Sequence, residues 1–389
     1  MKNIYLDYAA TTYVDKSVLN KMLPFFSDFF GNPSSLHRAG RTTKQAIDSA
    51  RAGIAGIIGA KKEEVIFTGS GTESDNLAII GAAHANAEFG KHIIVSKIEH
   101  KAVLGAAKKL EKEGFGVTYL NVDGSGLVKL LELKKYLKKD TTLVSVQYAN
   151  NEIGTIQPIF KISKIIKKVR GEKRFPLFHT DACQAAGALA MDVNKLGVDL
   201  MTFNGSKIYG PKGIGCLFVK RGVNLESQIL GGGQEMGLRA GTENVSSIVG
   251  LFEALKLAEK IKHRESRRQI RLRNYFIKNV LRSVEGINLN GHIQERLPNN
   301  INISVRGVEG ESLMLMLDRY GIFCSTGSAC SSTDLTPSYV LSAIGLSAEL
   351  TQGSIRMTLG RDTDKEKLDY VLKVLPAVVK KLRKISSVK

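Results

Sequence analysis

The sequence predicts an α/β protein whose mainly parallel central sheet is covered by helices on both faces, with a smaller α+β domain beside it. From about residue 40 to residue 260, short β-branched runs alternate with helical stretches. This alternation is typical of strands that are buried on both faces of a parallel sheet. The chain has 389 residues, of which 43% are hydrophobic and 24% are charged, so it is long enough for a large domain and a smaller one.

Seven runs are candidate strands of the large sheet: residues 65–68, 93–96, 117–120, 143–148, 177–180, 200–203 and 215–219. After Thr242 a long, basic, helical stretch runs to about Arg282. The last third then shows its own candidate strands at 300–305 and 355–359, and its own candidate helices at 311–319 and 364–384. We therefore predict a large α/β domain of residues 15–260 and a small α+β domain made of residues 1–14 and 261–389.

Composition excludes several classes of protein. No apolar run approaches the roughly 18 residues that a membrane span needs, and the first residues lack the apolar block of a signal peptide. We therefore expect a cytoplasmic protein that makes no contact with a membrane. The chain has four cysteines, at 183, 216, 324 and 330, with no C-x-x-C pair and no zinc-type cluster with its seven histidines. A disulfide scaffold and a metal site are not expected.

The net charge is +19, from 56 Lys and Arg against 37 Asp and Glu. Ten Lys or Arg residues lie between Lys256 and Arg282. Apolar residues at helical spacing accompany such basic stretches, which favours the solvated faces of amphipathic helices. A surface for nucleic acid or for an acidic protein is the alternative. Because no RNA-binding or zinc-finger signature accompanies the charge, direct nucleic-acid binding is not expected.

The first motif that can carry chemistry is FTGSGTESDN, at residues 67–76. It predicts a strand, a glycine turn and then a helix, and Thr72 with Asp75 fits a capping box. A helix start that glycines leave open presents free N–H groups, which bind anions such as phosphate. An ordinary strand–helix turn is the alternative. The Walker A ending, Gly-Lys followed by Ser or Thr, is missing.

Two further motifs follow later candidate strands. Asp181 lies in FHTDACQ, at residues 178–184, where a parallel sheet binds ligands or where the carboxylate caps a helix. Lys207 lies in NGSKIYGPKG, at residues 204–213. A lysine partly shielded between apolar strands can form a Schiff base with an aldehyde, whereas most lysines are simply solvated.

Together these three motifs meet the requirements of a pyridoxal phosphate site. The phosphate of that cofactor needs the helix start, its pyridinium nitrogen needs a carboxylate, and its aldehyde needs a lysine. The sequence therefore predicts this cofactor.

The chain resembles cysteine desulfurases, which are pyridoxal phosphate enzymes with the fold-type I architecture of the class V aminotransferase group. The resemblance runs from Tyr5 to Arg361. Its motifs are YLDYAATT at 5–12, GNPSS at 31–35, EHKAV at 99–103, NNEIG at 150–154, RAGT at 239–242, STGSAC at 325–330 and SIR at 354–356. The number and the order of these motifs make the resemblance specific.

The resemblance implies a role for each residue that binds the cofactor. Lys207 would hold the aldehyde and move protons. Asp181 would pair with the pyridinium nitrogen, His100 would stack on the ring, and Gln184 would contact the phenolic oxygen. Five residues would hold the phosphate. Gly71 and Thr72 lie at the helix start, Asn204 and Ser206 lie just before Lys207, and Thr242 would come from the neighbouring subunit.

The chain departs from the usual family sequence at two of these positions, and a third position implies a partner subunit. The family usually has His where this chain has Ser206, and Ser where it has Asn204. A contribution of Thr242 to the neighbouring subunit implies a homodimer. For the substrate, the resemblance implies that Asn151 and Arg356 bind the carboxylate of L-cysteine, and arginine suits this because it forms two parallel hydrogen bonds with such a group. It also implies that Asn151 contacts the cofactor.

Cys330 would be the residue that receives sulfur. Its thiolate would attack the substrate sulfur, L-alanine would leave, and a persulfide would stay on Cys330. The extended stretch from Cys330 to Val340 resembles the long-loop branch of the family, which implies an iron–sulfur scaffold protein or another sulfur acceptor as partner and allows a tRNA-modifying enzyme. The chain ends at Lys389, where long-tailed relatives carry a further segment for scaffold docking.

The other three cysteines, Cys183, Cys216 and Cys324, lie in or beside apolar runs, so we expect them to be buried and inert. Two other functions stay open. A selenocysteine lyase or another class V β-lyase would not need Cys330. A non-catalytic sulfur-carrier or nucleic-acid-binding protein would bind no cofactor.

Overall fold

A computed structural model describes residues 3–326 and 337–385 of the chain. Its largest sheet has seven strands in the order β2-β8-β7-β6-β5-β3-β4. The strands are β2 (Val65–Thr68), β3 (His92–Ser96), β4 (Gly116–Leu120), β5 (Thr141–Ser145), β6 (Leu177–Asp181), β7 (Leu200–Asn204) and β8 (Gly215–Val219). The run from β4 to β7 is parallel, and β8 is antiparallel to both β7 and β2. The prediction of a mainly parallel sheet is confirmed.

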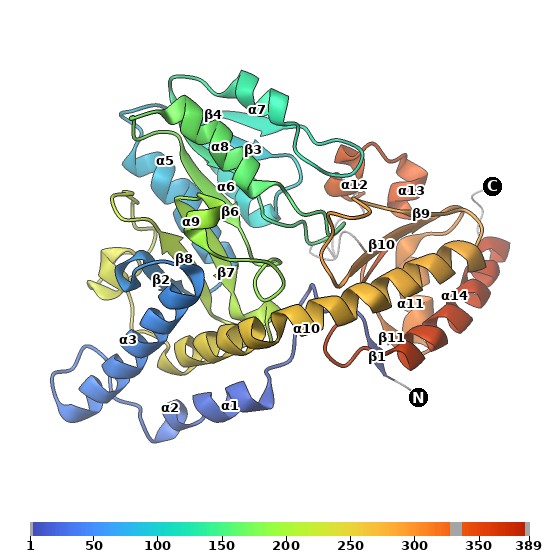
Figure 1. Cartoon of the computed structure of the whole chain (residues 1–389), viewed down its shortest axis with the longest axis horizontal. Coiled ribbons are helices and arrows are strands. Elements are labelled where there is room, and N and C mark those ends of the chain that lie inside the picture. Colours follow the sequence, from blue (N-terminus) through green and yellow to red (C-terminus); the bar gives the residue numbers. More distant parts are fainter. Residues whose placement is uncertain (1–2, 327–336, 386–389) are drawn as a thin grey trace.

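Helices cover both faces of this sheet (Figure 1). They are α3 (Arg38–Ile58), α6 (Lys101–Lys112), α7 (Leu130–Tyr136), α8 (Ile159–Arg170), α9 (Val193–Leu196) and a continuous helical segment made of α4 (Gly71–Asn76), the π-helical turn η2 (Leu77–Gly81) and α5 (Ala82–Ala85). Strand residues alternate between the two faces. Phe178 packs in the core with α3 and α8, whereas its neighbour Leu177 packs in the core with α5 and α6.

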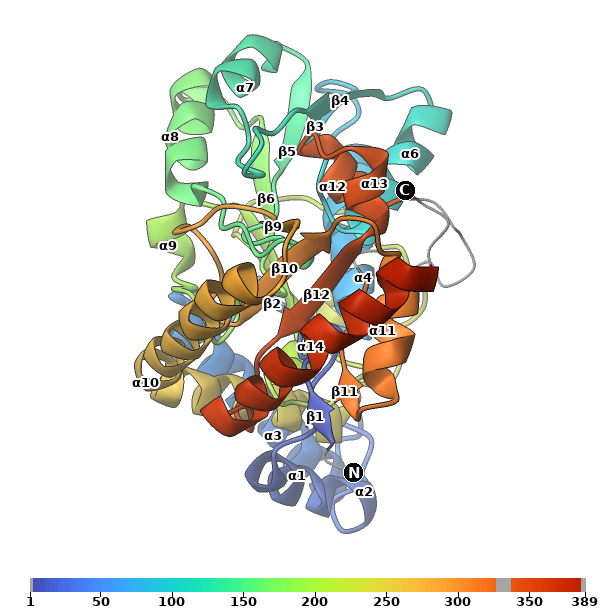
Figure 2. The same ribbon diagram turned by 90° about the vertical axis from the view of Figure 1, so that its right-hand side faces the viewer.

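A smaller group of elements packs around a separate apolar core (Figure 2). It holds an antiparallel sheet of β9 (Ile287–Leu289), β10 (Asn300–Val305) and β12 (Ser354–Thr358), and a parallel pair of β1 (Ile4–Tyr5) and β11 (Ile322–Phe323). Its helices are α11 (Gly310–Asp318), α13 (Ala348–Gln352) and α14 (Lys365–Ile385). The helix α12 (Tyr339–Ala343) instead contributes Val340 and Leu341 to a core of the large sheet. Ile4 and Leu6 reach this core from the start of the chain.

The helix α10 (Val245–Ser283) connects the two groups of elements (Figure 1). Its first half packs on α3 and on α1 (Lys16–Met22), which precedes α2 (Pro24–Ser27). Its second half contributes Phe276 and Val280 to the smaller core. The helix passes without a break through the boundary predicted near residue 260, so the division into residues 15–260 and the rest stays a prediction.

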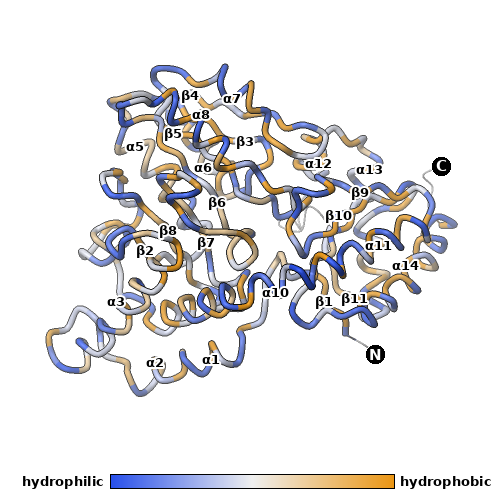
Figure 3. The backbone as a smooth tube through the Cα atoms, viewed as in Figure 1, coloured by the Kyte–Doolittle hydropathy of each residue, from blue (hydrophilic) through white to orange (hydrophobic). Residues whose placement is uncertain are grey.

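The hydropathy of the chain follows this architecture (Figure 3). The strands of the large sheet are apolar, whereas the middle of α10 is hydrophilic. None of the helices in the described ranges is both long enough and apolar enough to cross a lipid bilayer.

Candidate active site

The turn that carries Lys207 lies against the start of the chain. β7 ends at Asn204, and a single 3-10 turn, η3 (Gly205–Lys207), follows it. Lys207 Nζ donates to the carbonyl of Ala10, and Gln184 Nε2 donates to the carbonyl of Ala9 at 3.0 Å. Thr12 N–H in turn donates to Ser206 O at 2.9 Å. Residues 9–12 therefore pack directly against the turn that carries the predicted lysine.

Asp181 is the last residue of β6, and its side chain is largely buried. Its Oδ1 accepts a hydrogen bond from Cys183 N–H at 2.8 Å. The residues after it form turns, so the alternative of a helix cap is not what the structure shows. The carboxylate thus lies at the carboxyl end of a central parallel strand, where α/β folds bind ligands.

A buried polar group lies next to Asp181. His179, two residues earlier on the same strand, contacts Ser145 Oγ at 2.9 Å and Thr202 Oγ1 at 3.1 Å, and its Nε2 lies 3.7 Å from Asp75 Oδ1. Burial lowers the pKa of His179 to about 4, so its ring is neutral at pH 7. Burial, and then the charge of Asp181, raise the pKa of Asp75 well above its ordinary value. The neutral form of Asp75 is therefore favoured more strongly than that of an exposed aspartate.

Gly71 starts the helical segment that the sequence predicts as a phosphate site. A Cβ at this position would lie 2.8 Å from Cys183 Sγ and 2.9 Å from Asn204 Nδ2, which is closer than side-chain packing tolerates. Only glycine lets the helix start approach these two residues. Cys183 lies two residues after Asp181, and Asn204 lies three residues before Lys207. The three predicted motifs therefore meet at one place.

The cap of this helix differs from the prediction. Ser70, not Thr72, is the N-cap, because Ser70 Oγ accepts from Glu73 N–H at 3.1 Å. Glu73 reaches back and accepts from Gly69 N–H at 2.8 Å, so the acidic partner is Glu73 rather than Asp75. The predicted capping box, Thr72 with Asp75, is therefore wrong, and the observed one lies two residues earlier, at Ser70 and Glu73. As a result, Thr72 lies exposed in the first turn of the helix.

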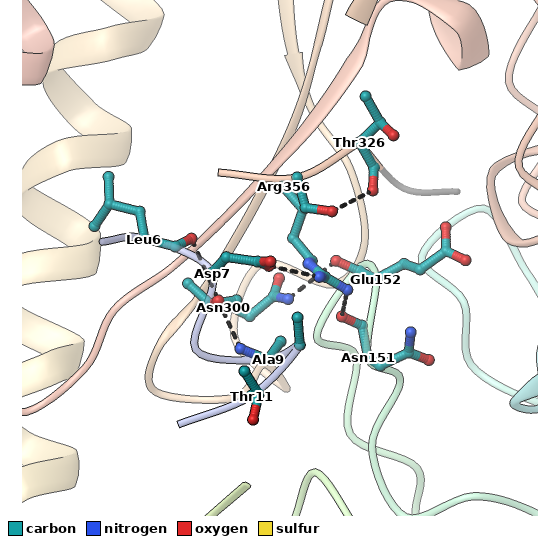
Figure 4. Close-up of polar contacts among 12 residues, drawn as sticks. Leu6, Asp7, Ala9, Thr11, Asn151, Glu152, Asn300, Thr326 and Arg356 are labelled. Carbon is teal, nitrogen blue, oxygen red and sulfur yellow. Dashed lines mark hydrogen bonds and ion pairs between the residues drawn. The ribbon is translucent and has the colours of Figure 1, made fainter. Parts of the chain in front are cut away.

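Arg356 lies on β12 and is almost fully buried (Figure 4). Its Nη2 donates to Asp7 Oδ1 at 2.8 Å, and its Nη1 donates to Asn151 O at 3.1 Å. Its Nε is buried and has no hydrogen-bond partner among the described residues. Asp7 and Asn151 thus occupy the two terminal nitrogens of the guanidinium, and the Nε–H remains for a ligand. A carboxylate fits the Nε edge of a guanidinium with two hydrogen bonds.

His100 is the N-cap of α6, and its Nδ1 accepts from Ala102 N–H at 3.2 Å. The preceding residue, Glu99, is buried and accepts from Gln147 N–H at 2.9 Å. Burial raises the pKa of Glu99 to about 8. The main-chain carbonyl of Glu99 accepts from Tyr339 Oη at 2.7 Å. These contacts fix the backbone that carries His100.

Cys330 lies outside the described residues. The described residues on either side of that gap contact the Arg356 site. Ser325 exchanges two backbone hydrogen bonds with Arg356, of 3.1 and 2.7 Å. Ser338 Oγ donates to Glu152 Oε2 at 2.6 Å, and burial raises the pKa of Glu152 to about 7. Both neighbouring segments are therefore anchored beside the predicted carboxylate site.

Cys216 and Cys324 are buried as predicted, whereas Cys183 is only partly buried. Loss of solvation raises the pKa of all three thiols. The pKa of Cys324 rises to about 12. Thiols of this kind are not ionised at neutral pH and are poor nucleophiles. Thr242 is exposed and lines a cavity of about 270 Å³ together with Gly69 and Arg239.

Comparison with known proteins agrees with this geometry. Residues 4–371 match the family described as Aminotransferase class-V. The chain belongs to the class V aminotransferase family. It is 52% identical over 388 residues to "Cysteine desulfurase IscS" of Dictyoglomus turgidum, which covers 100% of this chain and 97% of that protein. It is 48% identical over 385 residues to "Cysteine desulfurase IscS" of Methanosarcina thermophila, covering 99% and 94%.

Solved structures show the same relationship. The chain superimposes on a "NIFS-LIKE PROTEIN" with a TM-score of 0.91 and 36% identity, covering 98% of this chain and 100% of that one. It also matches a structure described as "SspA in complex with cysteine", with a TM-score of 0.80 and 36% identity, covering 92% and 98%. The fold-type I architecture expected from the sequence is confirmed, and the chain is a member of the cysteine desulfurases within its family.

The family implies pyridoxal phosphate, and the residues present fit this cofactor. The Gly71 cradle supplies helix N–H groups for a phosphate, with Asn204 and Ser206 beside it. Asp181 is a largely buried carboxylate that could pair with the ring nitrogen. Lys207 could supply the amine. Among the described residues, no group of three His, Cys, Asp or Glu side chains is placed to bind a metal ion.

Sequence reasoning missed the polar groups that support this site. The roles of Asp7, Asp75 and His179 were not predicted, although each lies within or beside a motif that the sequence singled out. An acid or an imidazole flanked by apolar strand residues was the available signal. The contacts of Asp7 with Arg356 and of Asp75 with His179 join residues more than 100 positions apart in the chain, which no local pattern shows.

Proposed function

We propose that this protein is a cysteine desulfurase that takes the sulfur of L-cysteine and releases L-alanine. The observation that carries the proposal is the meeting of the three motifs at Gly71, which brings a phosphate cradle, Asp181 and the Lys207 turn together. A phosphate site, a carboxylate for the ring nitrogen and an amine for the aldehyde are the groups that pyridoxal phosphate needs.

The substrate carboxylate binds the Nε edge of Arg356. Asp7 and Asn151 hold the guanidinium in place, so the arginine is oriented before substrate arrives. This pre-orientation lowers the entropy cost of fixing the substrate. Asn151 contributes its side-chain amide to the same carboxylate.

Lys207, His100 and Asp181 act on protons. When bound, pyridoxal phosphate supplies an electron sink for the bonds at the substrate Cα. Lys207 Nζ takes the proton from Cα and later returns a proton to Cα, whereas the proton of the substrate thiol, which His100 accepts, ends on the carbon that becomes the methyl group of alanine. Asp181 would keep the ring nitrogen protonated, and His100 would stack on the ring. Gln184, Thr72, Ser206 and the partner subunit's contribution at the position of Thr242 complete the cofactor site.

Cys330 accepts the sulfur. Its thiolate attacks Sγ of the substrate, the Cβ–Sγ bond breaks, and the Sγ–Sγ bond of a persulfide forms. The electron pair of the broken bond stays with the alanine carbon, which then takes a proton. The anchoring of Ser325 on Arg356 and of Ser338 on Glu152 supports a position of this segment beside the substrate.

We further propose that the enzyme works as a homodimer in the cytoplasm and passes its sulfur to an iron–sulfur scaffold protein or another acceptor, with a tRNA-modifying enzyme as a second kind of recipient. The identity to proteins named IscS over the whole chain supports a role as sulfur donor.

The role of Cys330 is tested with Cys330→Ser, which keeps the size of the side chain and removes the nucleophile. We expect alanine formation from L-cysteine to fall at least 100-fold while the visible spectrum of bound cofactor is unchanged. Cys216→Ser, at a buried thiol on β8, is the matched control and keeps its activity. Undiminished alanine formation in Cys330→Ser would show a lyase that needs no persulfide.

A further inference from the structure

The outward face of α10 carries a continuous line of positive charge. We call it the basic stripe, and its exposed members are Lys256, Lys260, Arg264, Arg267, Arg271, Lys278 and Arg282. Their spacings of three, four and seven residues keep them on one side of a helix with 3.6 residues per turn. From Lys256 to Arg282 the stripe covers 27 residues, which is about 39 Å at the rise of an α-helix.

The opposite face of α10 packs against the rest of the protein. Ala258, Glu265 and Ser266 line a cavity of about 70 Å³ that also contains Lys207 and Gln184. The stripe therefore points away from the candidate active site. It cannot serve substrate binding directly, and the proposed reaction does not explain its charge.

The acids of α10 do not neutralise the stripe. Glu259 pairs with Lys262 and Glu265 pairs with Arg268, neither of which belongs to the stripe. Only Lys256 has a carboxylate partner, Glu253 at 3.6 Å. The other six members form no ion pair within residues 3–326 and 337–385, the ranges that the structure describes.

This arrangement differs from an ordinary solvated helix. Such a face usually mixes both signs at spacings of three and four residues, because opposite charges there stabilise the helix and like charges destabilise it. In the stripe, neighbours such as Lys260 and Arg264 repel each other. A polyanion that binds along the helix would relieve the repulsion and release its own counterions.

The chemistry of the stripe favours phosphates over an acidic protein. Protein interfaces depend on buried aromatic and apolar anchors, and the stripe itself contains only cations. The apolar residues Ile270 and Leu281, which are 36% and 42% exposed, lie at its margin. Phosphate contacts require only Lys and Arg at regular intervals.

The neighbours of α10 favour an RNA duplex over DNA. The helix packs against α3 and α1 in its first half and against α14 in its second, so it cannot enter a major groove as an isolated helix would. The A-form RNA helix instead offers a wide, shallow minor groove bordered by phosphates, which a flat surface can contact. We propose that the basic stripe binds the phosphate backbone of double-stranded RNA without reading its sequence.

The test compares two variants with equal loss of charge. One neutralises the stripe through Lys260→Gln, Arg264→Gln, Arg267→Gln and Arg271→Gln. The matched control neutralises four exposed lysines of α8 through Lys161→Gln, Lys164→Gln, Lys167→Gln and Lys168→Gln. Binding of a fluorescein-labelled 20-base-pair RNA duplex is measured by anisotropy between 50 and 200 mM salt, with the holoenzyme. Alanine formation and melting temperature establish that both variants are folded.

We expect the stripe variant to bind RNA at least tenfold more weakly at 50 mM salt. The slope of log K against log salt should become shallower by about 3 to 4, since each lost phosphate contact removes about 0.9. The α8 variant should bind like the natural sequence, and a DNA duplex of the same sequence should bind more weakly than RNA.

Four results would overturn the proposal: no binding of the RNA duplex at 50 mM salt, equal weakening in both variants, tighter binding of the DNA duplex, or binding of poly-L-glutamate in place of RNA. If the stripe variant melts early, Arg267→Glu alone replaces it, and unchanged RNA affinity in that single variant then contradicts the proposal.

Discussion

At the scale of single residues, Arg356 shows how a site can be recognised without its ligand. A buried N–H that lacks a partner costs about 1–3 kcal/mol, more for a charged group. The Nε of Arg356 is such a group, although Asp7 and Asn151 hold the other two nitrogens. The resemblance singled out this residue, but the sequence did not predict its unpartnered Nε, because that depends on contacts with residues 205 and 349 positions away.

Arg356→Lys should raise the KM for L-cysteine about 10- to 100-fold and change kcat by less than about threefold. A lysine keeps the charge but cannot form two parallel hydrogen bonds with a carboxylate. Steady-state alanine formation measures both constants. Arg306→Lys, at a residue whose side chain is 67% exposed, is the control and keeps both values. A KM within twofold of the natural enzyme would exclude this role of Arg356.

The raised pKa of Glu99 predicts how the stability of the protein depends on pH. Its pKa is about 8 in the folded protein, against 4.5 for an ordinary glutamate, because it is buried. Between these values the folded state holds a proton that the unfolded state has lost. This group's contribution to stability is therefore complete below about pH 4.5 and is lost as the pH rises through about 8, by up to about 1.4 kcal/mol per pH unit.

Glu99→Gln removes this titration and keeps the shape of the side chain. We expect the melting temperature of the natural protein to fall more between pH 6 and pH 8 than that of Glu99→Gln. Thermal unfolding at half-unit pH steps measures the difference. Glu63→Gln, at a side chain that is 64% exposed, should follow the natural protein. Parallel curves for the natural protein and Glu99→Gln would contradict a buried acid with a raised pKa.

At the scale of elements, apolar runs predicted most strands well. β2, β8 and β10 have the predicted bounds. β5 was predicted at 143–148 but is Thr141–Ser145. Its two threonines gave no apolar signal, and they are buried because His92 Nδ1 contacts Thr141 Oγ1 at 2.7 Å and Thr142 Oγ1 donates to His92 O. Beyond Ser145, Val146 and Tyr148 still donate to β6 carbonyls, at 3.1 and 2.7 Å.

The close packing around Gly71 predicts that a larger residue there weakens cofactor binding. Gly71→Ala places a methyl group 2.8 Å from Cys183 Sγ, so the helix start must move away from the phosphate position. We expect the affinity for pyridoxal phosphate to fall at least tenfold, measured by titration of the apoprotein with the cofactor. Gly105→Ala, where a Cβ on α6 meets nothing within 4 Å, is the control and should bind the cofactor normally. Equal affinity in the two variants would place the phosphate elsewhere.

At the scale of the whole molecule, the start of the chain joins the two groups of elements. β1 pairs with β11 more than 300 residues away, and the following residues then reach Lys207 and Gln184. The sequence predicted that residues 1–14 belong to the smaller domain, but it did not predict the pairing of β1 with β11 or the contacts with Lys207 and Gln184. Local periodicity defines an element, whereas the pairing of β1 with β11 depends on which distant edge is free once the fold has formed.

The most direct test of the central claim is the visible absorption spectrum of the purified protein with pyridoxal phosphate. We expect a band of protein-bound cofactor that is absent in Lys207→Ala, persists in the control Lys212→Ala, and changes when L-cysteine is added to the natural protein. A band that survives in Lys207→Ala after dialysis, or a natural protein that takes up no cofactor, would contradict the assignment of Lys207 and with it the proposed reaction.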